Sequence, residues 1–217
     1  MDAPAPLPEV ASLWIDTAAT QPRFDAQRGW TQCDVAIIGG GYTGLSAARY
    51  LAQKGLSPIV LEASRIGWGA SGRNGGVVSG KFRLAFSEIA AGWDIGMARR
   101  MHDLGIEAIA HVGELVETYR IKDAEFRESG SLRCAHNSQS LDALKKEVAW
   151  LHDTLGDRST SILSAADMMA ETGSSGFTGG LLNTHGGIIH PLNFVRGLAL
   201  GIASQGVGIF EQSPVTA

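Results

Sequence analysis

The chain has 217 residues, 44% of them hydrophobic, which suits one large or two small globular domains with a sizeable core. Its formal net charge is −4 and its cationic residues form only isolated pairs, which argues against nucleic acid as the main partner. No run approaches the roughly 20 apolar residues of a membrane span, and the acidic, proline-rich start lacks signal-peptide features, so a cytoplasmic protein is expected.

Residues 1–30 are expected to form an extended N-terminal arm, because they contain four prolines and no clear period. Trp14, Phe24 and Trp30 are the side chains available to pin this arm to the body of the protein. The arm ends where the first strongly apolar run begins.

A βαβ unit is predicted next. The apolar run 35–38 is typical of a fully buried strand, residues 42–55 carry apolar side chains at helical spacing, and 58–62 form a second short strand that ends on an acid. Two consecutive strands joined by a helix imply a parallel sheet.

The remaining elements alternate between helices and short strands. Helices are predicted over 86–120, 138–156 and near 164–171, with strands over 125–136 and within 177–191. Pro191 suits the first turn of a last helix, which runs to Gly206 before a final strand begins at Val207.

The turn between the first strand and the first helix carries a dinucleotide fingerprint, Gly39-x-Gly41-x-x-Gly44. Gly39 allows the tight turn, Gly41 lets the backbone approach a pyrophosphate, and Gly44 lets the helix pack against the strand. Glu62 is placed to accept hydrogen bonds from ribose hydroxyls, and its charge disfavours a 2′-phosphate. FAD and NAD share this fingerprint, but the glycine-rich stretch 67–76 that follows favours FAD; an NAD-linked dehydrogenase is the alternative.

The sequence contains two cysteines and six histidines, residue types that often bind metals. Cys33 and Cys134 show no CxxC spacing, and the histidines show no paired helical spacing, so no metal site is expected. The two thiols are interpreted as buried or half-buried in a reducing compartment.

Three segments together resemble the D-amino-acid-oxidase-like FAD-dependent oxidoreductases, and within them most closely the gamma-glutamylputrescine oxidoreductases. They are 37-IIGGGYTGLSAARYL-51, 60-VLEASRIGWGASGRNGG-76 and 186-GGIIHPLNFVRGLALGIASQGVGIFEQSPV-215. The resemblance implies an α/β protein with a Rossmann-like FAD-binding domain and a second, α+β substrate domain, of which this chain would be an N-terminal fragment. Residues 31–85 would start the FAD-binding domain, 86–190 would form part of the substrate domain, and 191–217 would return to the FAD-binding domain.

The same resemblance implies an activity: oxidation of the C–N bond of a small amine or amino acid by hydride transfer to flavin N5. Oxygen is the expected acceptor, giving hydrogen peroxide. The cofactor-binding residues that carry over are Gly39, Gly41, Tyr42, Thr43 and Gly44 at the pyrophosphate turn, Glu62 and Ala63 at the ribose, Arg65, Gly69, Ala70, Ser71, Arg73, Asn74, Gly75 and Gly76 along the cofactor, and Val215 at the adenine.

Because a flavin carries most of the chemistry, no catalytic triad is expected. Three candidate residues, Arg73, Asn74 and His190, each have a functional and a structural interpretation. Arg73 either faces a substrate carboxylate or cofactor phosphate, or braces the loop. Asn74 either fixes the loop or reaches the flavin edge, and His190 either orients the start of the last helix or takes part in catalysis. Trp68 is expected to pack rather than to cover the cofactor, and a cofactor-free binding module is the non-enzymatic alternative for the whole chain.

Overall fold

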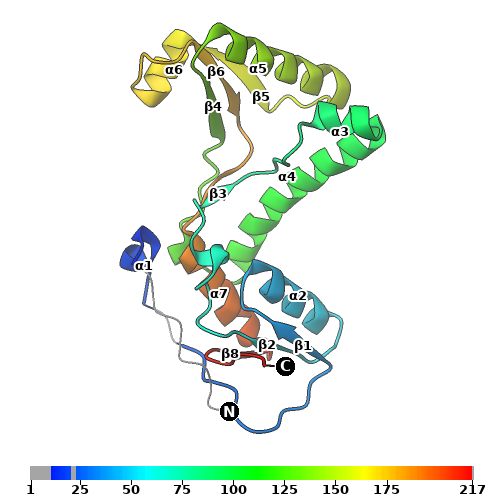
Figure 1. Ribbon diagram of the computed structural model, residues 1–217, viewed down its shortest axis with the longest axis vertical. Helices are drawn as coiled ribbons and strands as arrows, with labels where there is room; N and C mark the ends of the chain where they lie inside the picture. Colours follow the sequence, from blue (N-terminus) through cyan, green and yellow to red (C-terminus); the bar gives the residue numbers. More distant parts are fainter. Residues whose placement is uncertain (1–10, 21–22, 217) are drawn as a thin grey trace. The chain divides into compact units, whose positions relative to one another are not determined.

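The computed structural model describes residues 11–20 and 23–216, which fall into two compact units that interleave along the sequence. Unit 1 combines residues 1–76, 113–126 and 189–217, and unit 2 combines 77–112 and 127–188 (Figure 1). The parts of the expected arm at residues 1–10 and 21–22 lie outside the described residues, as does Ala217.

These boundaries differ from the segments expected from sequence. Unit 2 begins at Val77 because β3 (Val77–Val78) pairs antiparallel with β7 (Gly187–Ile188). Unit 1 also takes in residues 113–126, the end of α4 (Ile95–Thr118) and the short helix η2 (Lys122–Ala124). Buried Ile121 packs so closely against α7 (Pro191–Ala203) that Gly197 has no room for a Cβ atom, which ties this segment to unit 1.

Unit 1 is built on a parallel sheet in the order β1-β2-β8, formed by Val35–Ile38, Pro58–Leu61 and Gly208–Phe210. The helix α2 (Tyr42–Gln53) joins β1 to β2, and α7 precedes β8 (Figure 1), so the predicted βαβ unit and last helix are confirmed. The core of this unit includes Leu45, Ala48, Val60, Val195, Leu198, Ile202 and Ile209.

The expectation that 35–38 is buried on both faces was wrong. Burial alternates along β1, and Ile38 is 72% exposed. Ile37 points to the face where α2 packs, and lies beside Gly44, while Ile38 points to the opposite face. Among the described residues, β2 is the one strand that pairs with β1.

The arm of unit 1 contains a short helix, α1 (Leu13–Thr17), instead of being extended throughout. Ser12 caps it by accepting a hydrogen bond from the backbone N–H of Ile15. Trp14 does pin the arm, as expected, whereas Trp30 is 85% exposed and does not.

Unit 2 contains an antiparallel sheet in the order β4-β6-β5, formed by Ser131–Ala135, Gly179–Asn183 and Thr160–Ser164. The helix α5 (Ser138–Trp150) covers one face, and a π-helical turn, Leu151–Leu155, extends it. Their core consists of Ala135, Leu144, Val148 and Leu181, with Leu141 and Ile162 packed against it.

The helix expected over 86–120 is two helices, α3 (Phe86–Gly92) and α4, separated at Trp93 and Asp94. A further helix, α6 (Ala165–Thr172), begins with a capping box in which Ser164 and Asp167 satisfy each other's backbone N–H groups. Cys33 is half-buried as expected, but Cys134 is exposed. The neighbouring side chain, Ala135, faces α5. Because successive side chains of a strand point to opposite faces of the sheet, Cys134 points away from α5.

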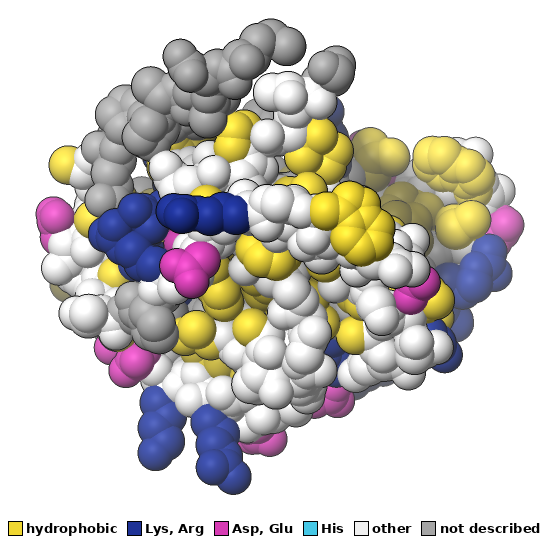
Figure 2. Space-filling view, turned by 90° about the horizontal axis from the view of Figure 1, so that it is seen from below, with side chains coloured by type: hydrophobic (Ala, Val, Ile, Leu, Met, Phe, Trp, Pro, Cys, Tyr) yellow, Lys and Arg dark blue, Asp and Glu magenta, His cyan; other side chains and the backbone are white. Residues whose placement is uncertain are grey.

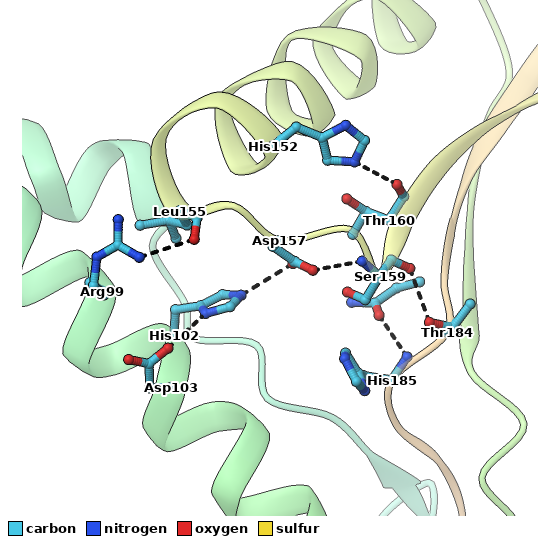
Figure 3. Close-up of polar contacts among 11 residues, drawn as sticks. Arg99, His102, Asp103, His152, Leu155, Asp157, Ser159, Thr160, Thr184 and His185 are labelled. Carbon is cyan, nitrogen blue, oxygen red and sulfur yellow. Dashed lines mark hydrogen bonds and ion pairs between the residues drawn. The ribbon is translucent and has the colours of Figure 1, made fainter.

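A partly buried polar network joins α4 to the connection between α5 and β5 (Figure 3). The imidazole of His102 lies 3.1 Å from the carboxylate of Asp157, which accepts the backbone N–H of Ser159 at 2.7 Å. Arg99 donates to the carbonyl oxygens of Thr154 and Leu155. Burial raises the pKa of the Asp157 carboxyl, but the hydrogen bond from Ser159 and the contact with His102 outweigh burial and leave the pKa below its usual value.

The face seen in Figure 2 shows Lys and Arg side chains in small separate groups, with Asp and Glu near them and apolar side chains between. In the described part of the chain, no helix has the length and apolar character needed to cross a membrane.

We predict that Asp157→Ala lowers the free energy of unfolding by roughly 1–3 kcal/mol, because it leaves the Ser159 N–H and His102 without their buried acceptor. Urea unfolding followed by circular dichroism measures this change. Asp103→Ala is the matched control: Asp103 also lies beside His102, at 3.3 Å, but its side chain is 58% exposed against 7% for Asp157. If the two substitutions lowered the free energy of unfolding equally, the larger effect expected from the burial of Asp157 would be contradicted.

Candidate functional site

The turn between β1 and α2 is closed by two glycines. Gly39 has a φ of +101°, in the region that favours glycine, and its N–H donates to the carbonyl of Leu61. At Gly44 the carbonyl of Gly39 occupies the place of a Cβ atom, so any larger residue would push α2 away from the strand. The tight turn and close packing predicted for these two glycines are therefore present.

The first turn of α2 offers backbone donors at the edge of the sheet. The N–H of Gly40 donates to Glu62 Oε2 at 2.8 Å, and the N–H of Tyr42 donates to Ser71 Oγ at 3.0 Å. Those of Gly41, Thr43 and Gly44 have no acceptor among the described residues. Unpaired N–H groups at the positive end of a helix form an anion-binding position.

Glu62 follows β2 and links the end of that strand to the turn between β1 and α2. Besides the N–H of Gly40, its carboxylate accepts the N–H of Ser64 at 2.9 Å. A carboxylate has about four acceptor positions, so two remain for hydroxyl groups of a ligand. The predicted ribose position is thus compatible with a carboxylate that the chain itself holds in place.

The stretch 67–76 is an ordered loop with a single 3-10 turn, Ala70–Gly72. The side-chain amide of Asn74 donates to the carbonyls of Ala70 and Ser71, and its oxygen accepts the N–H of Gly76. Of the two interpretations of Asn74, the structure contains the bracing of the loop.

The glycines of this loop fall into two groups. Gly72 is closed in by the carbonyl of Gly67 and by Leu192, and Gly76 has a φ of +70° with the carbonyl of Ile189 against it. At Gly69 and Gly75 a Cβ atom would meet nothing within 4 Å. The chain's own packing therefore requires glycine at the first two positions and leaves open space at the other two.

Arg73 makes a contact that neither interpretation anticipated. Its guanidinium carbon lies 4.4 Å from the centre of the Trp68 ring, a cation–π arrangement. This contact agrees with the expectation that Trp68 packs within the loop, and it orients Arg73 without using a backbone carbonyl.

His190 caps α7. Its Nδ1 accepts the N–H of Asn193 at 3.2 Å, so the neutral ring carries its proton on Nε2, which lies 3.1 Å from the hydroxyl of Thr17. The structure thus contains the predicted orientation of the helix start. Burial is the largest cause that lowers the pKa of His190; the Arg196 charge adds to it, while Glu125 opposes it.

Sequence reasoning missed a buried carboxylate, Glu211, which binds the segment just before the loop. It is 4% exposed and accepts the N–H of Ile66 at 2.7 Å, the N–H of Phe24 at 3.2 Å and the guanidinium of Arg65 at 3.3 Å. Arg65 is therefore held by an acid within the chain. No local pattern marks Glu211, since its partners lie at least 145 residues away.

The remaining expected residues lie at the same edge of the sheet. Burial raises the pKa of the Tyr42 hydroxyl, partly opposed by Asn74, and the hydroxyl donates to the carbonyl of Pro191. The N–H of Ser213 donates to the carbonyl of Glu62. Val215 lies two residues further along the chain from this contact. Ala63 and Val215 are both exposed.

The described residues contain no group of three or more His, Cys, Asp or Glu side chains that could hold a metal ion. The chemistry of the donors instead fits a dinucleotide: three backbone N–H groups for a pyrophosphate, a carboxylate for a ribose, and open glycines along the adjoining loop. Unit 1 therefore has the geometry expected of a nucleotide-binding βαβ unit.

The comparison with protein families identifies its class. The DAO model, described as FAD dependent oxidoreductase, matches residues 34–217, and the chain belongs to this family. FAD, the cofactor expected from the sequence, is the cofactor of the family.

Among curated proteins, the chain is 36% identical over 207 residues to gamma-glutamylputrescine oxidoreductase of Escherichia coli, covering 95% of this chain and 48% of that protein. It is 34% identical over 206 residues to the probable oxidoreductase OrdL of Haemophilus influenzae, covering 95% of this chain and 47% of that protein. The chain thus spans about half the length of these relatives.

Solved structures support the fold. An L-amino acid deaminase from Proteus myxofaciens matches 88% of this chain and 41% of its own, with a TM-score of 0.69 at 20% identity. Glycine oxidase from Bacillus cereus matches 83% of this chain and 48% of its own, with a TM-score of 0.62 at 22% identity. At these identities the likeness concerns the fold.

We predict that His190 makes stability depend on pH. Because its pKa is lower in the folded chain, the unfolded chain binds more protons just below the usual value of about 6.5. The contribution of His190 is therefore full above that pH and is lost as the pH falls through the folded pKa.

Thermal unfolding of the wild type and of His190→Asn between pH 5 and 8 measures this dependence. Asparagine is a good capping residue that does not titrate, so the variant should lose less stability than the wild type on acidification. Parallel pH profiles for the two proteins would show that His190 has no such role.

Proposed function

We propose that this chain binds FAD at the edge of the β1-β2-β8 sheet and serves the oxidation of a C–N bond in a small amine or amino acid. The observation that carries the proposal is the first turn of α2, where the N–H groups of Gly41, Thr43 and Gly44 have no acceptor among the described residues. A pyrophosphate would supply those acceptors.

The chain's own residues would hold the cofactor in sequence along the edge. Glu62 would bind ribose hydroxyls, the turn at Gly39–Gly44 the pyrophosphate, and the loop 69–76 the part nearer the flavin ring. Ala63, Arg65, Ala70, Ser71, Arg73 and the backbone at Val215 are proposed as further contacts. When bound, FAD supplies the hydride acceptor, and oxygen is proposed as the final electron acceptor.

Gamma-glutamylputrescine is the proposed representative substrate, because the E. coli relative named for it shares 36% identity with this chain. Anaerobic addition of this compound to the flavin-loaded protein should bleach the flavin absorbance, and admission of air should restore it with formation of peroxide. If another amine or an amino acid bleaches the flavin and gamma-glutamylputrescine does not, the substrate assignment is wrong while the reaction class stands.

The binding step is tested first, by titrating the purified chain with FAD and with NAD⁺ and following flavin fluorescence and calorimetry. FAD should bind in a 1:1 complex. Binding of NAD⁺ in place of FAD would favour the dehydrogenase alternative, and binding of neither would remove the proposed function.

We predict that Gly75→Ala weakens FAD binding at least tenfold, about 1.4 kcal/mol, without changing the stability of the FAD-free protein by more than about 0.5 kcal/mol. In the chain alone the added methyl group meets nothing within 4 Å, so only a bound ligand would clash with it. The dissociation constant and the midpoint of thermal unfolding separate the two effects.

The matched control is Gly92→Ala, in α3, where a Cβ atom also meets nothing within 4 Å. It should leave the dissociation constant for FAD unchanged, whereas the higher helix propensity of alanine should raise the unfolding midpoint slightly. A Gly75→Ala variant that binds FAD as tightly as the wild type would place the cofactor away from this loop.

A further inference from the structure

A side chain of the N-terminal arm, that of Trp14, reaches the loop proposed to hold the cofactor. The indole N–H of Trp14, in α1, donates to the carbonyl oxygen of Asn74 at 2.8 Å. The two residues are 60 positions apart. The Trp14 ring also meets His190 edge to face, with ring centres 4.9 Å apart.

Two further hydrogen bonds hold α1 against the start of α7. His190 Nε2 lies 3.1 Å from the Thr17 hydroxyl, which donates to the carbonyl of Leu13. The N–H of Ala19 donates to the side chain of Asn193, 3% exposed, at 3.0 Å. The position of Trp14 is thus supported by two contacts at the C-terminal end of its short helix.

From Asn74 the contacts continue to the anion-binding turn. Asn74 Nδ2 donates to the carbonyl of Ser71, and Ser71 Oγ accepts the N–H of Tyr42, the first residue of α2. One path of hydrogen bonds therefore connects the arm, the glycine-rich loop and the first turn of the helix. Trp14 therefore contacts the loop at Asn74, the residue whose side chain braces the loop.

We infer that Trp14 is a positioning residue of the cofactor site: it holds the loop 69–76 in its binding conformation before FAD arrives. This role rests on the proposed function. A loop already held in its bound shape loses less conformational entropy on binding, so the anchor acts through cofactor affinity. Trp14 itself touches neither FAD nor substrate in this role.

Trp14→Phe tests the inference, because phenylalanine keeps a ring beside His190 and removes only the N–H donor to Asn74. Loss of one such hydrogen bond should weaken FAD binding about three- to tenfold. The unfolding midpoint of the FAD-free protein should stay close to that of the wild type, a separation that a merely structural role would not produce.

The matched control is Trp30→Phe, the same substitution at a side chain that is 85% exposed in the same unit. It should leave the dissociation constant for FAD unchanged. Trp14→Ala, which also removes the ring, should weaken binding further and raise hydrogen exchange of the amides of residues 70–76 in the FAD-free protein.

The outcomes separate this inference from the proposed function. If the wild type binds no FAD, the proposed function fails and the hydrogen-exchange comparison still reports whether Trp14 orders the loop. If the wild type binds FAD and Trp14→Phe binds it equally well, or if Trp30→Phe has the same effect as Trp14→Phe, the positioning role of Trp14 is wrong.

Discussion

The close approach between the carbonyl of Gly39 and the backbone at Gly44 sets the geometry of unit 1. Because no side chain intervenes, α2 starts directly at the end of β1, and its first N–H groups emerge at the carboxyl edge of the parallel sheet. Glu62 leaves β2 at the same edge and bonds to the N–H of Gly40. The anion-binding turn and the carboxylate are therefore neighbours as a consequence of one steric constraint.

That constraint also explains why the loop 67–76 is not a linker. It leaves the same edge and is held by the chain at Gly72, Gly76 and Asn74, each through contacts with backbone atoms. A linker would not need a glycine where a neighbouring carbonyl excludes any Cβ atom. The open positions at Gly69 and Gly75 lie within this fixed frame, so their lack of side chains leaves space for something outside the chain.

Local patterns carried much of the prediction from sequence. The βαβ unit, the last helix and the cap at His190 each lie in one continuous stretch of the chain, and the sequence displays them. What failed depends on distant partners. Periodicity cannot tell how many faces of a strand are covered, so the exposure of Ile38 was missed. The pairing of β3 with β7 joins residues more than 100 positions apart and moves the boundary of unit 2. The cap of α2 by Ser71 and the contacts of Glu211 are equally non-local.

Ser71 shows how such a distant contact shapes the site. Gly41 precedes α2 without a capping side chain of its own, and Ser71 supplies the missing acceptor to Tyr42 from another part of the chain. One of the helix's exposed donors is thereby committed to the loop, while its neighbours Thr43 and Gly44 keep theirs. The hydrogen bond between Ser71 and Tyr42 thus holds the first turn of α2 and the loop at a fixed distance without any ligand. For the proposed cofactor, which would span both, the entropy of ordering the loop would then be lost on folding and not on binding.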